Sequence, residues 1–142
     1  KSTLLKLIMG LEIPSKGDIF VNNINTKDFT FEFIHRNFSC AFQEGVLFDE
    51  GVSGGEAKRT LFSRALSKEA NILILDEVDT GVDASGYSNM INILKSKAKN
   101  CLIIMVSHRN NDSQDIFWDY KLHVNNNTVN FLETKEGRPA HS

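Results

Sequence analysis

Three short apolar runs, separated by stretches with helical spacing, constrain the fold of this 142-residue chain more than any other feature. The runs are FSCAF (38–42), ILIL (72–75) and CLIIMV (101–106). Strands that are apolar throughout are typical of a parallel sheet covered by helices on both faces. Apolar residues recur with helical spacing at 56–68 and 85–99. The pattern predicts an α/β fold, with a mainly parallel sheet and flanking helices.

The two ends of the chain supply further elements. KSTLLKLIMGL (1–11) predicts a buried helix that ends near Gly10. DIFVNN (18–23) predicts a strand, and FTFEFIHRN (29–37) fits either a helix or a strand. The segments YKLHV and TVNFLE, which flank an asparagine turn, predict a terminal hairpin. TKEGRPAHS, residues 134–142, is expected to be a polar tail after a domain that spans 1–133.

The composition excludes some classes of function. A net charge of −2 gives no basis for a nucleic-acid partner held by bulk electrostatics. No run reaches the roughly 18 apolar residues that cross a bilayer. Cys40 and Cys101 lie in apolar runs, and two free buried thiols are the favoured interpretation over a disulfide.

Polar side chains follow each of the three apolar runs. Gln43 follows the first, Asp76 and Glu77 the second, and Ser107 and His108 the third. Ligands of an open parallel sheet bind at the carboxyl ends of its strands. Any one of these polar ends is explained equally well by an ordinary solvated loop. Three together, with an acid pair among them, indicate a binding site.

ILILDE (72–77) has the form of a Walker B strand. Asp76 would then hold a magnesium ion, since divalent ions of this kind take oxygen ligands. Glu77 would orient or deprotonate an attacking water molecule. Two merely solvated acids at a strand end are the simpler alternative when this pattern stands alone.

Lys1, Ser2 and Thr3 precede the first predicted helix and match the end of a P-loop, G-x-x-x-x-G-K-[ST]. Lys1 would reach the β- and γ-phosphates, and Ser2 would be a magnesium ligand. The glycines of that motif are absent before Lys1. We therefore expect the chain to be a piece of something longer.

VSGGEAKR (52–59) places a serine and two glycines before a helical run. Ser53, Gly54 and Gly55 offer a hydroxyl and backbone N–H groups without Cβ bulk, which suits an approaching phosphate. A flexible turn whose serine caps the helix is the alternative for these three residues alone.

Taken in order, these motifs resemble the nucleotide-binding domains of ABC ATPases. The match runs from Lys1 to about Glu133 and comprises KST, a Q-loop, the LSGGQ-type signature, Walker B, a D-loop and a switch histidine, in the segments KSTLLKLIMGLEIPSKGDIFVNN, FSCAFQEGVLFD, VSGGEAKR, ILILDE, DTGVD and IIMVSH. The resemblance implies the P-loop NTPase core of the ABC type, with ATP and Mg²⁺ bound.

The resemblance also implies the role of each residue. Glu77 would be the general base and His108 would contact the γ-phosphate. Gln43 would sense that phosphate and join Ser2 and Asp76 around the metal. The remaining nucleotide-binding residues are Lys1, Thr3 and the D-loop Asp83, and Ser53, Gly54 and Gly55 would complete the site of a partner subunit.

The implied function is ATP hydrolysis that powers an ABC transporter, at the cytoplasmic face of a membrane. QEGVLFD and SHR favour the exporter branch. The implied partners are a second nucleotide-binding domain, identical or different, and the transmembrane domains. A non-transport ABC ATPase in assembly or chromosome organisation stays open as an alternative, as does a subunit that binds ATP without hydrolysing it.

The chain departs from the family pattern in two places. Val78 replaces the usual proline, and Thr80, Gly81 and Val82 replace the usual D-loop interior, which puts D-loop communication in doubt. Ser53 follows Gln43 by only ten positions, where the family carries a helical subdomain of several dozen residues. We expect that subdomain to be largely missing, with a gap near 50–51.

Overall fold

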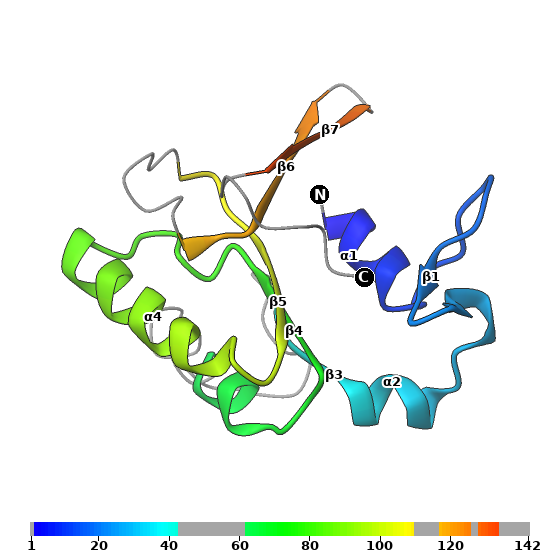
Figure 1. Ribbon diagram of the computed structural model, residues 1–142, viewed down its shortest axis with the longest axis horizontal. Coiled ribbons are helices and arrows are strands. Elements are labelled where there is room, and N and C mark those ends of the chain that lie inside the picture. The colour runs from blue at the N-terminus through cyan, green and yellow to red at the C-terminus, as the bar shows by residue number, and fades with distance from the viewer. Residues whose placement is uncertain (1, 43–61, 110–116, 126–127, 134–142) are drawn as a thin grey trace, which may run out of the picture. The chain divides into compact units, whose positions relative to one another are not determined.

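The computed structural model describes residues 2–42, 62–109, 117–125 and 128–133. The chain divides into two compact units, Lys1–His108 and Arg109–Ser142. This division differs from the expected boundary between a domain at 1–133 and a tail at 134–142, which stays a prediction. Figure 1 colours the elements by residue number. The first unit contains the sheet on which the candidate site is built.

The first unit is built around a parallel sheet in the order β3-β4-β5. β3 spans Phe38–Ala41, β4 spans Ile72–Asp76 and β5 spans Leu102–Val106. Each strand is one of the apolar runs found in the sequence, so the predicted α/β fold is confirmed. The register pairs Ala41 with Leu75 and Asp76 with Val106, so the three carboxyl ends lie at one edge.

The strands are not equally buried. All five residues of the central strand β4 are buried, as predicted, whereas Leu102 at the start of β5 is 59% exposed and the rest of β5 is half-buried. The expectation that β5 is a buried strand is therefore wrong among the described residues. β5 is an edge strand there, paired with β4 alone.

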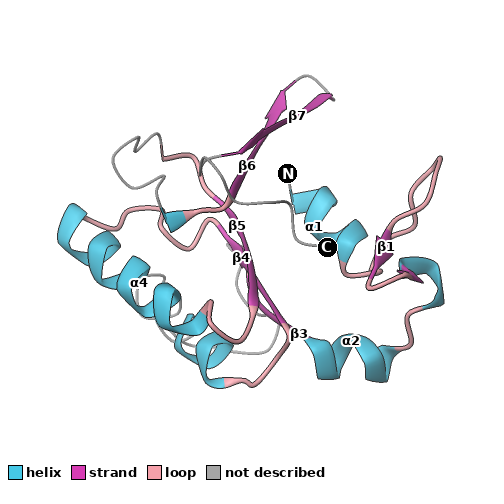
Figure 2. Ribbon diagram, viewed as in Figure 1, coloured by secondary structure: helices cyan, strands magenta, loops and turns pink. Residues whose placement is uncertain are grey.

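Helix α1 (Ser2–Ile8) covers one face of this sheet. Its Leu5, and Met9 just beyond it, pack in a cluster with Phe38, Ile72 and Ile74. The helix ends as predicted, because Gly10 has a left-handed backbone with φ 75° and the Leu11 N–H donates to the Lys6 carbonyl. Figure 2 shows α1 on the opposite side of the sheet from α4.

Helix α4 (Ala84–Lys97) covers the other face. Its buried stripe has the spacing of one helical face and consists of Tyr87, Met90, Ile91 and Leu94. Leu73 and Leu75 are fully buried, and they alternate along β4 with the residues that face α1. Both faces of the central strand are therefore covered, as a continuously apolar strand requires.

The predicted strand at 18–23 is wrong in its extent. β1 covers only Phe20–Val21 and pairs antiparallel with β2 (Ile24–Asn25). The two residues between them, Asn22 and Asn23, have φ values of 51° and 64°, which is the backbone of a tight hairpin turn. Asparagine tolerates this conformation better than most residues, so the chain turns where we expected it to continue.

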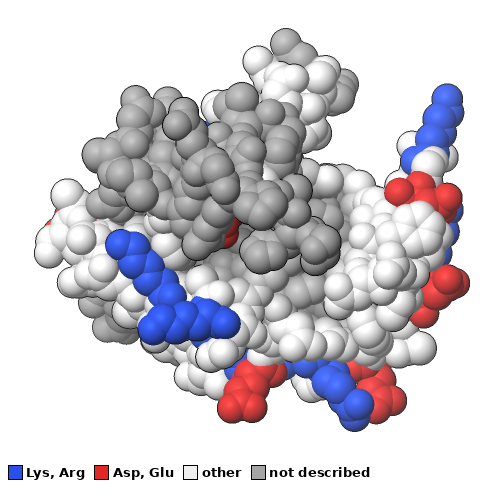
Figure 3. Space-filling view, viewed as in Figure 1, with Lys and Arg blue, Asp and Glu red and all other residues white. Residues whose placement is uncertain are grey.

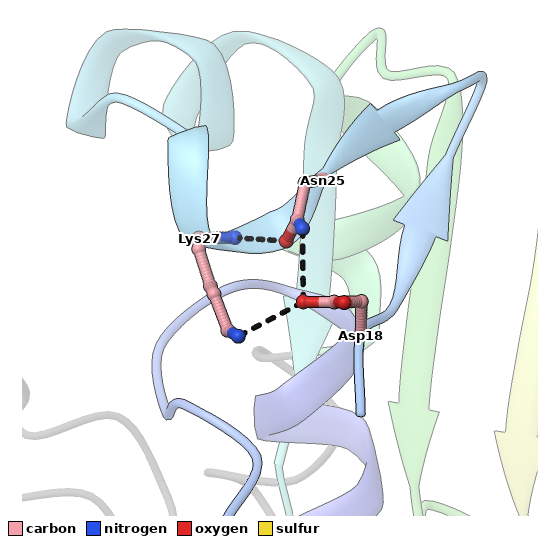
Figure 4. A network of polar contacts seen from close by, with 3 residues as sticks. All are labelled: Asp18, Asn25 and Lys27. Atoms are coloured by element: carbon pink, nitrogen blue, oxygen red, sulfur yellow. Dashed lines mark hydrogen bonds and ion pairs between the residues drawn. The ribbon is translucent and has the colours of Figure 1, made fainter. Parts of the chain in front are cut away.

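A polar network fastens this hairpin to the short 3-10 helix η1 (Thr26–Asp28), as Figure 4 shows. The Asp18 carboxylate accepts from Lys27 Nζ at 2.9 Å and from Asn25 Nδ2 at 3.1 Å. Asn25 Oδ1 in turn accepts from the Lys27 backbone N–H at 3.0 Å. These hydrogen bonds, that of Lys27 foremost, lower the pKa of Asp18.

The ambiguous segment at 29–37 is mostly a helix. α2 spans Phe31–Asn37, and the Thr30 side chain caps it by accepting from the Phe33 N–H at 3.1 Å. Residues 62–67 are also helical, which agrees with the helical spacing predicted for 56–68 over the part that is described.

The second unit contains an antiparallel hairpin, as predicted. β6 (Tyr120–Asn125) pairs with β7 (Thr128–Glu133), from Tyr120 with Glu133 to Asn125 with Thr128. Cys40 and Cys101, in the first unit, are both free thiols, as preferred, but they are half-buried and not buried as expected. Among the described residues, no helix is long and apolar enough to cross a membrane.

Candidate functional site

The candidate site begins at the carboxyl end of β4, where the strand delivers two acids. Asp76, the last residue of β4, is only 4% exposed. Glu77 follows it with a left-handed backbone, φ 55°, which is rare for a residue with a side chain. Such strain costs about 1–3 kcal/mol and is concentrated at functional sites. The backbone N–H of Glu77 donates to the Val106 carbonyl at 2.9 Å, which ties the turn to β5.

His108 meets Glu77 across this edge. The Nε2 atom of His108 lies 2.5 Å from Oε1 of Glu77, although the two residues are 31 positions apart. The glutamate side chain is 16% exposed and the imidazole 64% exposed. A base and a histidine predicted from separate strand ends are thus brought into direct contact, with the ring open to solvent. The role predicted for His108, contact with a γ-phosphate, is not tested by this contact and stays a prediction.

A second contact joins the same two loops, and the sequence did not predict it. The Ser107 hydroxyl donates to Oδ2 of Asp79 at 2.5 Å, and Asp79 is 2% exposed. Its one signal in the sequence is a third acid in DEVDT, two positions after Glu77. The candidate site therefore contains three carboxylates, two of them buried.

Asp83, predicted as the D-loop aspartate, caps helix α4. Its Oδ1 atom accepts from the Gly86 N–H at 2.7 Å, and its carbonyl accepts from the Tyr87 N–H at 2.9 Å. Between Asp79 and Asp83 the chain turns through Gly81, which has φ 77°, and the Val82 N–H donates to the Asp79 carbonyl. The loop at 79–83 therefore runs directly from the buried acid to the start of α4.

The other predicted site residues are placed only in part. Ser2 begins α1, and Thr3 lies exposed in the first turn of that helix. The helix predicted to follow KST is therefore present. The remaining members of the predicted site lie outside the described residues: Lys1, Gln43, Ser53, Gly54 and Gly55. The expected gap near 50–51 lies there as well.

The donor set decides which metal could fit. Among the described residues, no group of three or more His, Cys, Asp and Glu side chains could hold a metal ion. Magnesium binds through one or two carboxylates together with water and substrate phosphates, and does not need an all-protein cage. One buried carboxylate at the strand end, Asp76, fits that manner of binding.

The surface charge of the described residues is mixed. In Figure 3, lysine and arginine side chains lie in small groups, several of them close to aspartate and glutamate side chains. One exposed pair joins Arg36 and Glu32 on helix α2 at 3.3 Å. Exposed pairs of this kind contribute little to stability.

Sequence comparison finds relatives of a consistent kind. The chain is 32% identical over 137 residues to the zinc import ATP-binding protein ZnuC of Photobacterium profundum, a match that covers 76% of this chain and 53% of that protein. The chain spans 51% to 60% of the length of the first curated relatives it matches. No family model matches the chain.

Two solved structures share the fold at low sequence identity. The ATP-binding cassette MJ0796, in a dimeric post-hydrolysis state bound to ADP and Pi, has a TM-score of 0.77 at 16% identity, over 94% of this chain and 80% of that chain. A bacterial Atm1-family ABC exporter with ATP bound has a TM-score of 0.68 at 18% identity, over 77% of this chain and 28% of that chain. At such identities the likeness shows the fold alone.

These comparisons confirm the resemblance that the ordered motifs predicted. The curated relatives are ATP-binding proteins of ABC transporters, and the matching structures are an ATP-binding cassette and an ABC exporter. The parallel sheet of this chain, with helices on both faces, agrees with that fold. The chain therefore has the fold of an ABC ATPase cassette, of which it represents a part, and its sequence is similar to the ATP-binding proteins of ABC transporters.

Proposed function

We propose that the protein that carries this chain binds ATP with Mg²⁺ and hydrolyses the γ-phosphate. The observation that carries the proposal is the contact between Glu77 and His108, 2.5 Å apart beside the buried Asp76. The contact lies at the carboxyl edge of a parallel sheet, where ligands of such sheets bind. The ABC cassette fold supports the assignment, and one matching cassette was solved with ADP and Pi.

In this mechanism Glu77 accepts a proton from the attacking water. The water oxygen forms a bond to the γ-phosphorus as the bond from that phosphorus to the bridging oxygen of ADP breaks. When the proton of the imidazole is on Nε2, His108 donates to Oε1 of Glu77 and fixes the carboxylate. The second carboxylate oxygen is then oriented for the water. A positioned base of this kind contributes about 10²- to 10⁴-fold to the rate.

We assign the metal to Ser2, Gln43 and Asp76, and the phosphates to Lys1, Thr3 and Gln43. When bound, Mg²⁺ would neutralise charge on the phosphate oxygens. The buried position of Asp76 supports its part in this set. A cation is a favourable neighbour for a buried carboxylate, so the burial of Asp76 is compatible with a metal at this position.

The proposal includes a second nucleotide-binding domain as partner. Ser53, Gly54 and Gly55 of one copy would complete the site formed by Lys1 and Glu77 of the other, with Asp83 near the junction. The matching cassette MJ0796 is dimeric, which supports this arrangement. The partner is a second copy or a related chain.

We further propose that hydrolysis drives transport through membrane domains, with this chain at the cytoplasmic face. The curated relatives, which are ATP-binding proteins of transporters, support this part of the proposal. QEGVLFD favours export, and one structure with the same fold belongs to an exporter, whereas several curated relatives serve zinc import. Uptake or efflux by inside-out vesicles that contain the full transporter distinguishes the two directions.

The decisive experiment replaces the proposed base in the full-length protein. We expect Glu77→Gln to lower kcat for ATP hydrolysis by about 10²- to 10⁴-fold, because the amide cannot accept the proton. The Kd for a fluorescent ATP analogue with Mg²⁺ should change by less than about 3-fold, because the amide keeps the shape of the side chain. Such a change is less than about 0.7 kcal/mol of binding free energy.

Glu69→Gln is the matched control, because Glu69 is an exposed acid just before β4, at the opposite end of the strand. It should leave kcat at the wild-type value. Wild-type turnover in Glu77→Gln would overturn the assignment of the base. A full-length protein that binds no magnesium nucleotide would overturn the proposed function as a whole.

A further inference from the structure

The two loops that carry Glu77 and His108 are joined by more than that pair. A backbone bond runs from the Glu77 N–H to the Val106 carbonyl, and the Ser107 hydroxyl donates to Asp79. Each partner of these contacts lies within two residues of Glu77 or His108. The contact between His108 and Glu77 is thus one of three described contacts between these two loops, and it is the one with the most solvent-exposed side chain.

The three contacts differ in how strongly water competes with them. The His108 ring is 64% exposed, so its hydrogen bond to Glu77 is exchanged readily for bonds to water. Asp79 is 2% exposed, and a buried bond to a carboxylate is stronger than one at the surface. The buried contact therefore limits where the backbone of His108 can go, and the exposed contact only orients the ring.

Burying the Asp79 carboxylate costs free energy unless the group is hydrogen-bonded, and the Ser107 hydroxyl supplies such a bond. The position of Asp79 also gives it two neighbours that matter for the site: its carbonyl accepts from the Val82 N–H, and the loop ends at Asp83, which caps α4. The carboxylate thus connects the histidine loop with the loop at 79–83.

We propose that Asp79 is a positioning residue, whose carboxylate holds Ser107 and, through Ser107, keeps the His108 ring beside Glu77. The inference rests on the ATPase function proposed above, because it assigns a role within that site. It adds a residue pair to the site: Asp79 acts on Ser107, which carries the next residue, His108. Neither Asp79 nor Ser107 is placed against the substrate.

The test uses variants that remove or retain one hydrogen bond in the full-length protein. Ser107→Ala removes the hydroxyl, whereas Ser107→Thr retains it and serves as the conservative rescue. Asp79→Asn keeps an oxygen that accepts from Ser107. We expect Ser107→Ala to lower kcat for ATP hydrolysis by about 10-fold or more, since small displacements of catalytic groups cost up to about 10²-fold. KM for ATP should stay within about 2-fold, and Ser107→Thr should recover most of kcat.

A second readout does not depend on hydrolysis. The ring ¹⁵N signals of His108, assigned by their loss in His108→Gln, report whether Nε2 is bonded to a carboxylate or to water. Glu77→Gln provides the signal of the broken carboxylate contact. We expect Ser107→Ala to move the His108 signal toward that of Glu77→Gln, and Ser107→Thr and Asp79→Asn to keep it near the wild-type position.

The outcomes separate the two proposals. A wild-type kcat together with a wild-type His108 signal in Ser107→Ala would overturn the positioning role. A lowered melting temperature with an unchanged kcat and signal would assign Asp79 and Ser107 to stability alone, and would overturn it too. If the wild-type protein hydrolyses no ATP, the proposed function fails, while the His108 signal in Ser107→Ala still decides whether the pair positions the ring.

Discussion

At the scale of single residues, the molecule uses left-handed backbone conformations at points where the chain must change direction. Gly10 ends α1, Gly81 turns the loop after β4, and Glu77 adopts the same region at the candidate site. Glycine enters this region without the steric cost that a side chain brings. A left-handed glycine therefore costs little stability, whereas a left-handed residue with a side chain, such as Glu77, costs more.

Among the described glycines with a left-handed backbone, Gly10 is the one where a side chain would be tolerated least. A Cβ atom there would lie 2.8 Å from the Thr26 carbonyl oxygen and 2.9 Å from Cδ2 of Phe29. We expect Gly10→Ala to lower the free energy of unfolding by more than the roughly 1–2 kcal/mol that a left-handed conformation costs. Denaturant titration of the full-length protein measures the change.

Gly17→Ala is the matched control for this prediction. Gly17 has φ 76°, almost the same as Gly10, and a Cβ atom there would meet nothing within 4 Å. It should therefore show the conformational cost alone. Equal losses in the two variants would contradict the argument from the close approach of Thr26 and Phe29.

The sequence could predict some site residues and not others. Asp76 and Glu77 were found because they end an apolar strand, which is a local pattern. Asp79 accepts a hydrogen bond from Ser107, 28 positions later, and no local pattern reports such a pairing. The third acid of DEVDT reads as an ordinary loop residue until β5 is placed beside β4.

At the scale of elements, two lysines fasten segments that carry no catalytic residue. Lys68 Nζ donates to the carbonyls of His35 and Phe38, the latter at 2.7 Å, where α2 gives way to β3. Lys97 Nζ, at the end of α4, donates to the carbonyls of Leu66 and Lys68 at 2.9 and 3.2 Å. Each ammonium group satisfies carbonyls at the end of a helical segment.

Removing the Lys68 ammonium should therefore be costly. We expect Lys68→Met to lower the free energy of unfolding by about 1.5–3 kcal/mol, the range for hydrogen bonds to charged groups. Lys95→Met, on the exposed side of α4, is the control and should change stability by less than about 0.5 kcal/mol. A loss as small for Lys68 as for Lys95 would show that water replaces the ammonium group at those carbonyls. Chemical denaturation of both variants gives the comparison.

The type of an element was predictable where its pattern was strong. Continuous apolar runs identified β3, β4 and β5, because runs this short between helical segments are typical of the buried strands of a parallel sheet. Phe29, Phe31 and Phe33 alternate as in a strand, which left α2 ambiguous. The Thr30 cap resolves it, since the side-chain bond to the Phe33 N–H starts a helix there.

At the scale of the whole molecule, the fully buried apolar side chains of the described residues lie in the first unit. Leu73, in the middle of the central strand, has no exposed surface, and Leu5, Ile74, Leu75 and Leu94 are fully buried as well. We expect Leu73→Ala to lower the free energy of unfolding by about 2–5 kcal/mol, because it leaves a cavity in a packed core. Calorimetry of the full-length protein checks this.

Leu122→Ala is the control in the second unit, where the leucine is about half exposed on β6. It should change stability by less than about 1 kcal/mol, since much of its side chain already contacts water. If the two variants lost the same stability, the central strand would not be the core that its burial indicates.

The predicted fold of the first unit is confirmed, whereas only part of the predicted site lies among the described residues. The order of motifs carried the α/β architecture, which the strand pairing and the similar cassettes confirm. The positions that would form the other half of the site lie outside the described residues, and their roles stay predictions. In the proposed arrangement several of them face a partner subunit, and the sequence of one chain carries no local pattern that reports such a pairing.

The backbone of Glu77 has a consequence for how this chain could change over generations. At φ 55°, glycine or asparagine would have a lower conformational energy than glutamate. The backbone preference at this position therefore opposes the carboxylate that the proposed chemistry requires. If Glu77 is the base of the proposed hydrolysis, a descendant that no longer hydrolyses ATP would gain stability by replacing this glutamate. On that proposal, glutamate at this position would indicate selection for turnover, and its replacement would indicate that hydrolysis has been lost.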